Sequence, residues 1–305
     1  ENYIGSLNLK EGFTFTMTNF SFKYNSCSSL FGGGTGMLFS GISELTFNIC
    51  EFSNNEAHQD KTSSRPLENS PDNPYYNGDG GAIQIGCQKD TKLKKVTFNM
   101  CSFNNNKAFR HGGAIAIQTI NEVDLIDCKF DENIANFNFE SSDTLLFENH
   151  FHKKKEGRGG AIYLNPAAGC SESFTSAFTI NNCELNKNNA YDGYAIYVEG
   201  DDPTTKFVFI KNQFIDNYNE NNRDSDPTII YGAVIATEIC SITHDTLHQQ
   251  ENPENDNVFS YSKTIKVNEL SCVDHSGRTP THAFTESDYF PSDLFTPSIS
   301  FSYSG

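Results

Sequence analysis

Two short words alternate along the chain, and this alternation restricts the possible folds more than any other feature. The first, Cys-x-Phe-x-x-Asn-x-Ala, occurs at 50–57, 101–108 and 128–135, with looser copies at 20–27, 183–190 and 212–219. The second, Gly-Gly-Ala-Ile, occurs at 80–83, 112–115 and 159–162, with degraded copies at 34–37, 193–196 and 231–234. Self-similarity of this kind indicates units that stack on one another, because each unit is too small to bury a core alone.

The spacing of the first word separates the repeated unit from its insertions. Its anchor residues are Phe22, Phe52, Phe103, Phe130, Leu185 and Phe214. Steps of 27–30 residues therefore alternate with longer steps that carry an insert. The inserts lie at 56–79, 136–158 and 218–230, always between the Asn of the first word and the glycines of the second. Insertions at one point of a repeat map to one side of a solenoid, which is often its binding side.

Each unit has the period of β-strands. Residues alternate between apolar and polar after the glycines (Ile83-Gln84-Ile85), before the Cys (Val96-Thr97-Phe98) and across Cys-x-Phe itself. Period two places alternate side chains on opposite faces of a strand. Three short strands in about 27 residues predict an all-β fold, a parallel β-helix of at least six coils with its loop inserts on one side.

The residues that recur in the copies of the two words can be assigned structural roles. The Phe of each coil should fill the interior, stacked on the Phe above and below. The Asn should sit at a corner and bond the Asn of the next coil, which predicts a ladder of Asn55, Asn106, Asn133, Asn188 and Asn217. The glycines should permit a sharp corner, and the Ala should let it pack tightly.

These words resemble the Phe-x-x-Asn and Gly-Gly-Ala-(Ile/Leu/Val) motifs of the polymorphic outer membrane protein family, over residues 13–237. The resemblance implies a right-handed parallel β-helix displayed outside the cell and used in adhesion. Residues 1–237 are therefore predicted to form the repeat-bearing β-helix. Residues 238–305, where the words stop, are predicted to form irregular final coils and a C-terminal cap or tail.

Four of the nine cysteines, Cys50, Cys101, Cys128 and Cys183, occupy the same repeat position. Stacked coils lie about 4.8 Å apart, so two arrangements are open. The thiols can form a ladder of small buried groups, or they can be joined as Cys50–Cys101 and Cys128–Cys183 disulfides, for which the Cβ atoms of in-register coils are slightly far apart. Because no Cys-x-x-Cys occurs, the sequence predicts no zinc site.

An enzymatic reading requires converging acids or bases, since parallel β-helices also host polysaccharide lyases and hydrolases. The side chains expected to point outward after the glycines are Leu38, Gln84, Ala116, Tyr163, Tyr197 and Ile235. None is a carboxylate or a base. The charged stretches "GDGG" at 78–81 and "RHGG" at 110–113 are interpreted as structural turns. The sequence therefore predicts no catalytic residue and no cofactor.

The inserts hold the candidate contact residues. Tyr75 and Tyr76 lie on a proline-bracketed stretch of the first insert, a composition that suits protein or carbohydrate contact. The second insert carries His150, His152, Lys153, Lys154 and Lys155, the longest basic cluster of an acidic chain. This cluster is either a solvated loop or a contact for an acidic partner or a glycan. The two histidines have strand spacing and could share a metal, but the solvated loop is the preferred interpretation.

The net charge of −17 argues against a nucleic-acid partner, which requires a basic surface. No apolar run approaches the ~20 residues of a transmembrane helix. The leading hypothesis is a non-enzymatic extracellular or cell-surface protein that binds a protein or glycan partner through its inserts. One alternative is a structural subunit that self-associates end to end into a filament or larger surface structure. A polysaccharide lyase or hydrolase is the less favoured alternative.

Overall fold

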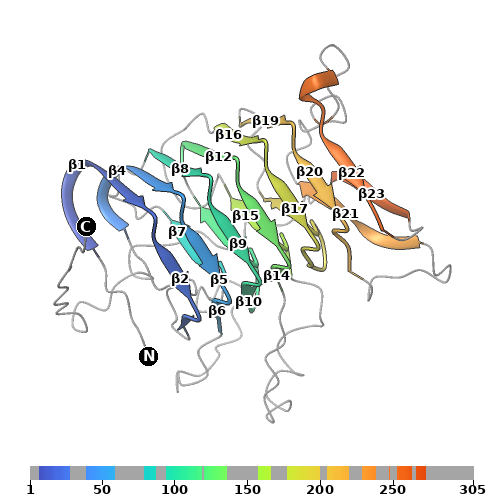
Figure 1. The fold of residues 1–305 in the computed structure, drawn as a ribbon, viewed down its shortest axis with the longest axis horizontal. Coiled ribbons are helices and arrows are strands. Elements are labelled where there is room, and N and C mark those ends of the chain that lie inside the picture. Colours follow the sequence, from blue (N-terminus) through green and yellow to red (C-terminus); the bar gives the residue numbers. More distant parts are fainter. Residues whose placement is uncertain are drawn as a thin grey trace, which may run out of the picture.

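The structure is a computed structural model. It describes residues 7–27, 39–58, 79–86, 94–118, 120–135, 157–165, 177–199, 205–219, 229–237, 247, 253–262 and 266–272. These residues form stacked strands that pair in parallel (Figure 1). The predicted parallel β-helix is confirmed. Within the described ranges, no helix is long or apolar enough to cross a membrane.

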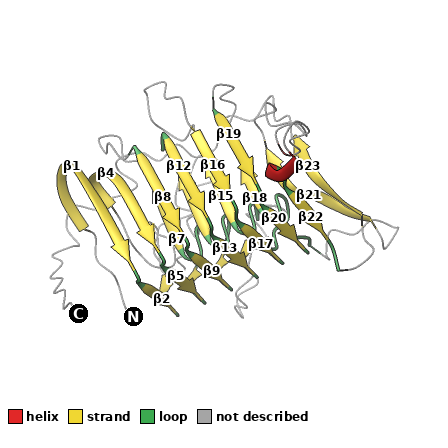
Figure 2. Cartoon of the chain, turned by 45° about the horizontal axis from the view of Figure 1, so that its top comes forward, coloured by secondary structure: helices red, strands yellow, loops and turns green. Residues whose placement is uncertain are grey.

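Four parallel sheets run along the stack, and we name them A to D. Sheet A contains β1 (Leu7–Thr18), β4 (Phe39–Asn48), β8 (Lys95–Asn99), β12 (Glu122–Ile126), β16 (Ala177–Asn181) and β19 (Lys206–Ile210). Sheet B contains β2 (Ser21–Lys23), β5 (Glu51–Ser53), β9 (Ser102–Asn104), β13 (Lys129–Asp131), β17 (Glu184–Asn186), β20 (Gln213–Ile215) and β22 (Val258–Ser260). Figure 2 shows the strands of these two sheets as adjoining rows.

The other two sheets complete each coil, so the stack has four sheets where the sequence predicted three strands in each unit; the strands of sheet C have only two residues, too few to show a period of two. Sheet C contains the two-residue strands β3 (Ser26–Cys27), β6 (Glu56–Ala57), β10 (Lys107–Ala108) and β14 (Ile134–Ala135). Sheet D contains β7 (Ile83–Gly86), β11 (Ile115–Gln118), β15 (Ile162–Asn165), β18 (Ile196–Val198), β21 (Ile229–Thr237) and β23 (Lys266–Cys272). A short 3₁₀ helix, η1, covers Pro253–Asn255. Because β22 and β23 pair with β20 and β21, the stack continues beyond residue 237.

Residues with positive φ make two of the corners. At the corner between sheets A and B they are Asn19, Ile49, Met100, Asp127, Asn182 and Lys211. At the corner between sheets B and C they are Tyr24, Asn54, Asn105, Glu132, Lys187 and Asp216. A left-handed residue bends the chain out of the strand, and the residue after it points inward. In the coils from β5 to β17 the inward residue is the Cys of the first word at one corner and its Asn at the other.

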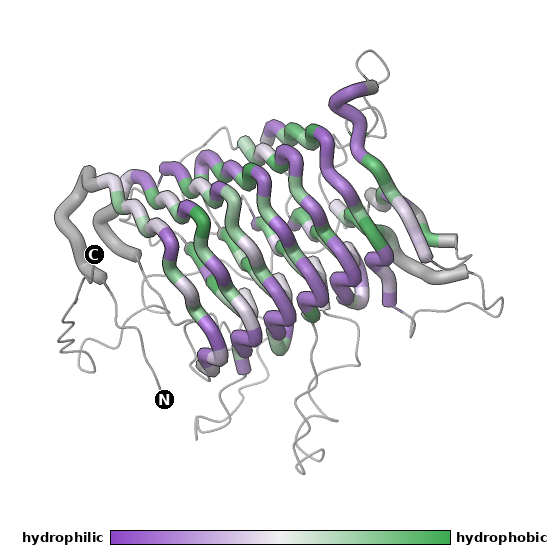
Figure 3. The backbone as a smooth tube through the Cα atoms, in the orientation of Figure 1, coloured by the Kyte–Doolittle hydropathy of each residue, from purple (hydrophilic) through white to green (hydrophobic). Residues whose placement is uncertain are grey.

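The interior is filled by in-register apolar columns. Phe52, Phe103 and Phe130 stack with ring centroids 4.8 Å apart and planes within 3° of parallel. Phe47 and Phe98 form a parallel column on sheet A, with centroids 4.9 Å apart. Buried apolar residues alternate with more exposed residues along the strands, and hydrophilic and hydrophobic residues alternate along each coil (Figure 3). One continuous core thus joins all the coils.

The last copy of the second word is shifted by one residue from its predicted position. Ile196 pairs with Ile235 and Tyr197 pairs with Ala236, so the word corresponds to 232–235 rather than 231–234. Ile235 is buried in the main core instead of pointing outward, and Ala236 takes the outward position. The prediction for Ile235 was wrong because the last copy of the four-residue word differs at two positions. Such a short, altered word can be aligned with the earlier copies in more than one register. Leu38 lies outside the described residues.

Candidate functional site

The Asn ladder joins the coils at the B/C corner. Asn106 is fully buried, and its side-chain NH₂ donates to the Phe52 carbonyl and to Asn133 Oδ1, both at 3.0 Å. Its own Oδ1 accepts from the backbone N–H of Asn55 at 3.1 Å and from the Asn55 NH₂ at 2.9 Å. The same pattern repeats through Asn133, Asn188 and Asn217. Asn55, Asn106, Asn133 and Asn188 therefore bond in both directions along the stack.

The four ladder cysteines are free, buried thiols that occupy the equivalent place at the A/B corner. Cys128 Sγ lies 3.4 Å from the Phe98 carbonyl, and Cys183 Sγ lies 3.4 Å from the Leu125 carbonyl. Asn212 continues this column, and its Oδ1 accepts from the Cys183 N–H at 2.9 Å. Of the two arrangements left open by the sequence, the structure has the thiol ladder. No three His, Cys, Asp or Glu side chains within the described ranges are grouped as metal ligands.

The ladder thiols should resist alkylation while the chain is folded. The hydrogen bond with Cys128, together with burial, raises the pKa of Cys101 to about 12, against an ordinary value of about 8.5. Burial likewise raises the pKa of Cys128. At pH 8 we expect iodoacetamide to leave Cys50, Cys101, Cys128 and Cys183 unmodified in native protein and to modify all four in urea. Peptide mass spectrometry checks this, and native labelling at the unfolded rate would contradict the buried ladder.

The three long inserts leave the stack at one corner. Residues 59–78, 136–156 and 220–228 lie outside the described residues, and so do the predicted contacts Tyr75, Tyr76, His150, His152, Lys153, Lys154 and Lys155. The described residues that flank the first two intervals are His58 and Asp79, and Ala135 and Gly157; each interval lies between a sheet C strand and the sheet D strand that follows it. Since strands of each sheet are in register, the stems of these inserts lie one above another.

A buried polar cluster stands at these stems on the outer side of sheet D, and we call it the stem network. Its members are Asp79, Arg110, His111, Arg158, Tyr163, Tyr197 and Glu199. Asp79 directly follows the undescribed interval 59–78 of the first insert, and Arg158 lies two residues after the interval 136–156 of the second. Arg110 and His111 belong to the short connection of the coil between them. The network therefore ties two insert stems to the coils beside them.

One half of the stem network is centred on Asp79, whose side chain is fully buried. Asp79 accepts from Arg110 Nε at 2.8 Å, from Arg110 Nη2 at 2.6 Å and from the His111 backbone N–H at 3.1 Å. Burial by itself lowers the pKa of Arg110, but the charge of Asp79 outweighs it, so the pKa is raised. The two-pronged contact holds the end of the first insert to the next coil.

The other half is centred on Glu199. Arg158 Nη1 donates to Glu199 Oε2 at 3.2 Å, and its guanidinium lies 4.8 Å from the centre of the Tyr197 ring. The Tyr163 hydroxyl donates to the same carboxylate oxygen. Burial, and then the charge of Glu199, raises the pKa of Tyr163 well above its usual range, so the hydroxyl remains a donor. The His111 ring stacks on Tyr163 with centroids 4.7 Å apart and links the two halves.

The stem network corrects the interpretation of the outward row. Ala116, Tyr163, Tyr197 and Ala236 point away from the core, as predicted for the first three, but they are buried and form a second cluster. The signal that the sequence offered was a charged or imidazole side chain directly before each glycine pair, at Asp79, His111 and Arg158. The network brings two guanidinium groups, of Arg110 and Arg158, against two carboxylates, of Asp79 and Glu199. Its contacts hold together the coils from which the first two inserts leave.

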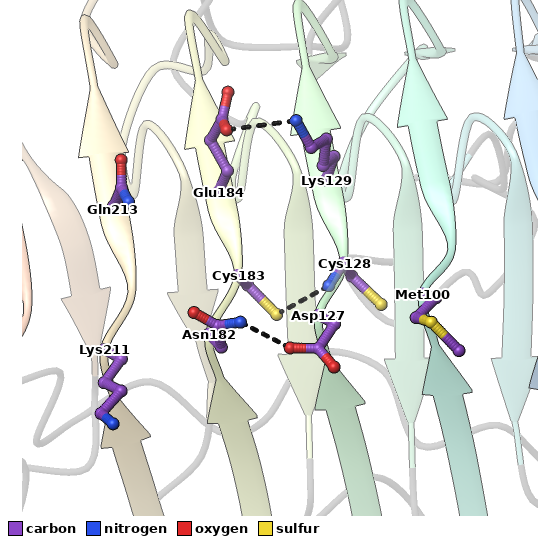
Figure 4. Close-up of a pocket in the computed structure, with 9 residues that line it drawn as sticks. All are labelled: Met100, Asp127, Cys128, Lys129, Asn182, Cys183, Glu184, Lys211 and Gln213. Atoms are coloured by element: carbon purple, nitrogen blue, oxygen red, sulfur yellow. Dashed lines mark hydrogen bonds and ion pairs between the residues drawn. The ribbon is translucent and has the colours of Figure 1, made fainter. Parts of the chain in front are cut away.

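A polar groove lies at the A/B corner, on a different part of the coil (Figure 4). Its volume is about 480 Å³. Asn182 Nδ2 donates to Asp127 Oδ1 at 2.6 Å, and Lys129 Nζ lies 3.4 Å from Glu184 Oε2. Met100, half-exposed, closes one end of the groove. Most of its polar groups thus already satisfy one another.

The comparisons with known proteins agree with the repeat. The family model described as the Chlamydia polymorphic membrane protein repeat matches residues 100–118, which contain one copy of Phe-x-x-Asn and one of Gly-Gly-Ala-Ile. No curated protein and no solved structure shows significant similarity to the chain. In its repeat, therefore, this chain resembles the polymorphic membrane proteins of Chlamydia.

Proposed function

We propose that this chain is a non-enzymatic β-helix of the cell surface or extracellular space that mediates adhesion through its inserts. The repeat match supports a surface protein of the adhesin type. Its binding partner is a protein or a glycan, and the inserts at 59–78 and 136–156 make the contact. Tyr75, Tyr76 and the basic stretch 150–155 are the proposed contact residues.

The observation that carries this proposal is the independence of the coils from the inserts. The ladders and the aromatic columns lie wholly within the described coils. Between Ala108 and Gly112 the C/D corner is closed by only three residues. A coil therefore needs no insert to close, and the inserts can vary in sequence while the stack remains unchanged. Variable loops on a rigid frame are the usual arrangement of a binding protein.

Removal of either insert tests the proposal. One variant joins His58 to Asp79, and the other joins Ala135 to Gly157, each by a short Gly-Ser linker. Asp79 and Gly157 are retained because they bond the neighbouring coils. We expect the free energy of unfolding to change by less than about 1 kcal/mol, since loop closure depends weakly on length. Binding of the labelled protein to cells, measured by flow cytometry over a panel of cell types, should fall to background.

In a third variant, Lys153, Lys154 and Lys155 are replaced by Gln and the length of the insert is kept. This variant separates the basic contact from the loop as a whole. Full binding by both deletion variants would contradict adhesion through the inserts. The non-enzymatic part is tested by incubation with a glycan panel followed by mass spectrometry. Retention without cleavage is expected, and cleavage by the purified chain would refute that part.

A further inference from the structure

A smaller groove lies at the B/C corner near the first coils. Its volume is about 290 Å³, and Tyr24, Asn54, Glu56, Asn105 and Lys107 are among its lining residues. Small-molecule sites usually span about 300–1,000 Å³. The groove therefore has room for one or two residues at the end of a chain-like ligand, rather than for a long segment.

Tyr24 is the unusual residue of this groove. It occupies the positive-φ position of its coil, with φ of 56°, where the next two coils have Asn54 and Asn105. Asn tolerates this backbone conformation better than bulkier residues do. The Tyr24 residue is also 78% exposed, the most exposed large hydrophobic residue of the described part of the chain. Neither the backbone conformation nor the packing of the coil favours a tyrosine at this position. This points to a role of the Tyr24 ring in contact with a ligand.

The remaining groups of the groove are polar and balanced in charge. Asn105 Nδ2 donates to Asn54 Oδ1 at 2.7 Å, which leaves the Asn54 NH₂ group without a partner among the described residues. Lys107 Nζ lies 3.5 Å from Glu56 Oε1, and His58 Nε2 lies 3.2 Å from Glu56 Oε2; all three side chains are partly exposed. A planar carboxylate, an amide and an ammonium group can accept and donate hydrogen bonds to hydroxyl groups. Because the charges offset each other, the groove favours neither an anion nor a cation.

We propose that this groove binds a neutral pyranose at the end of a glycan. The C–H face of the sugar ring lies on the Tyr24 ring, and the sugar hydroxyls bond Asn54, Glu56 and Lys107. A pyranose ring has one apolar face and a rim of hydroxyl groups. A site for it therefore combines an aromatic ring with a few fixed polar groups. The site belongs to the coils and not to the inserts, so it goes beyond the adhesion proposed above.

The affinity of one such shallow site should be low, with a Kd of about 1 mM. Several sites presented together would raise the effective affinity without new contacts. A test must therefore detect weak binding directly. Saturation-transfer difference NMR with the methyl glycosides of glucose, galactose, mannose and N-acetylglucosamine meets this need. We expect at least one of them to receive saturation, strongest on the protons of one ring face.

Two variants locate the site. Tyr24→Asn places the residue of the next two coils at this position, so the urea midpoint should be unchanged or higher, while the saturation signal falls at least tenfold. Tyr24→Phe retains the ring and should retain the signal. The matched control, Lys187→Asn, makes the same replacement at the equivalent corner of a distant coil and should leave the signal unchanged.

Each other outcome overturns the proposal. These outcomes are no saturation of any of the four glycosides, equal signals with and without the Tyr24 ring, or a loss in the Lys187→Asn control. Binding confined to an acidic sugar such as a sialoside, or to a peptide, would also overturn it. The insert-deletion variants separate this site from the proposed function, because they should lose adhesion to cells and keep the pyranose signal.

Discussion

Replacing Asn106 by Ala is expected to lower the free energy of unfolding by about 3–6 kcal/mol, because a buried group without its partner costs about 1–3 kcal/mol. The side chain accepts two hydrogen bonds from Asn55 and donates one each to Phe52 and Asn133. Its loss leaves two donors and one acceptor unsatisfied in a fully buried position. Urea titration followed by far-UV circular dichroism measures the change.

The chain provides matched controls in the same run of three asparagines. Asn104 is exposed at the end of β9, and Asn104→Ala should change the free energy of unfolding by less than about 0.5 kcal/mol. Asn105 has φ of 51° and bonds Asn54, so its replacement should fall between the other two. Equal effects at Asn104 and Asn106 would show that the ladder does not hold the coils together.

Replacing Gly113 by Ala is expected to lower the free energy of unfolding by about 3 kcal/mol or more, at the upper end for overpacked sites. A Cβ at Gly113 would lie 2.1 Å from the Gly160 carbonyl oxygen and 2.5 Å from the Ile134 nitrogen. Both atoms are backbone of the next coil, so no side chain can move aside. The two coils would have to separate, and the hydrogen bond from the Gly113 N–H to the Gly159 carbonyl, 3.1 Å long, would be lost.

The urea midpoint and the soluble yield, compared with those of Asn104→Ala, measure this effect. The equivalent position of a later coil holds Tyr194, so the local backbone of a coil accepts a side chain there. The need for glycine at position 113 therefore comes from the close approach of the coil that follows. A Gly113→Ala chain as stable as the parent would contradict the close approach of the coils at this corner.

The coil itself could be predicted from the sequence because its determinants are local and repeated. Phe103 and Asn106 recur in a fixed word, and each copy supports the assignment of the others. The stem network could not be predicted in the same way. Asp79 and Arg110 are 31 residues apart, and their pairing depends on which coil lies beside which. Ile235 was misplaced for a related reason, since one degraded word does not reveal a shift of a single residue.

The groove at Tyr24 was equally hidden from pattern analysis. The sequence shows that Tyr24 precedes the first ladder Asn, but it does not show that this position has positive φ in each coil from β2 to β20. That conformation turns the side chain out at a corner, beside Asn54 of the next coil. An exposed aromatic residue becomes informative only once the backbone around it is known.

The Asn ladder also gives the whole stack a direction. Every amide from Asn25 to Asn188 donates toward the C-terminal coil and accepts from the N-terminal one, wherever both neighbours exist. The amide dipoles are therefore aligned head to tail in a low-dielectric interior, where each bond polarises the next. At the ladder, each side-chain Oδ1 faces the preceding coil, and one N–H of each side-chain amide faces the following coil. A coil consequently has a single correct orientation in the stack. Adding whole coils to the solenoid preserves the polarity of the ladder. Reversing one coil would interrupt the ladder.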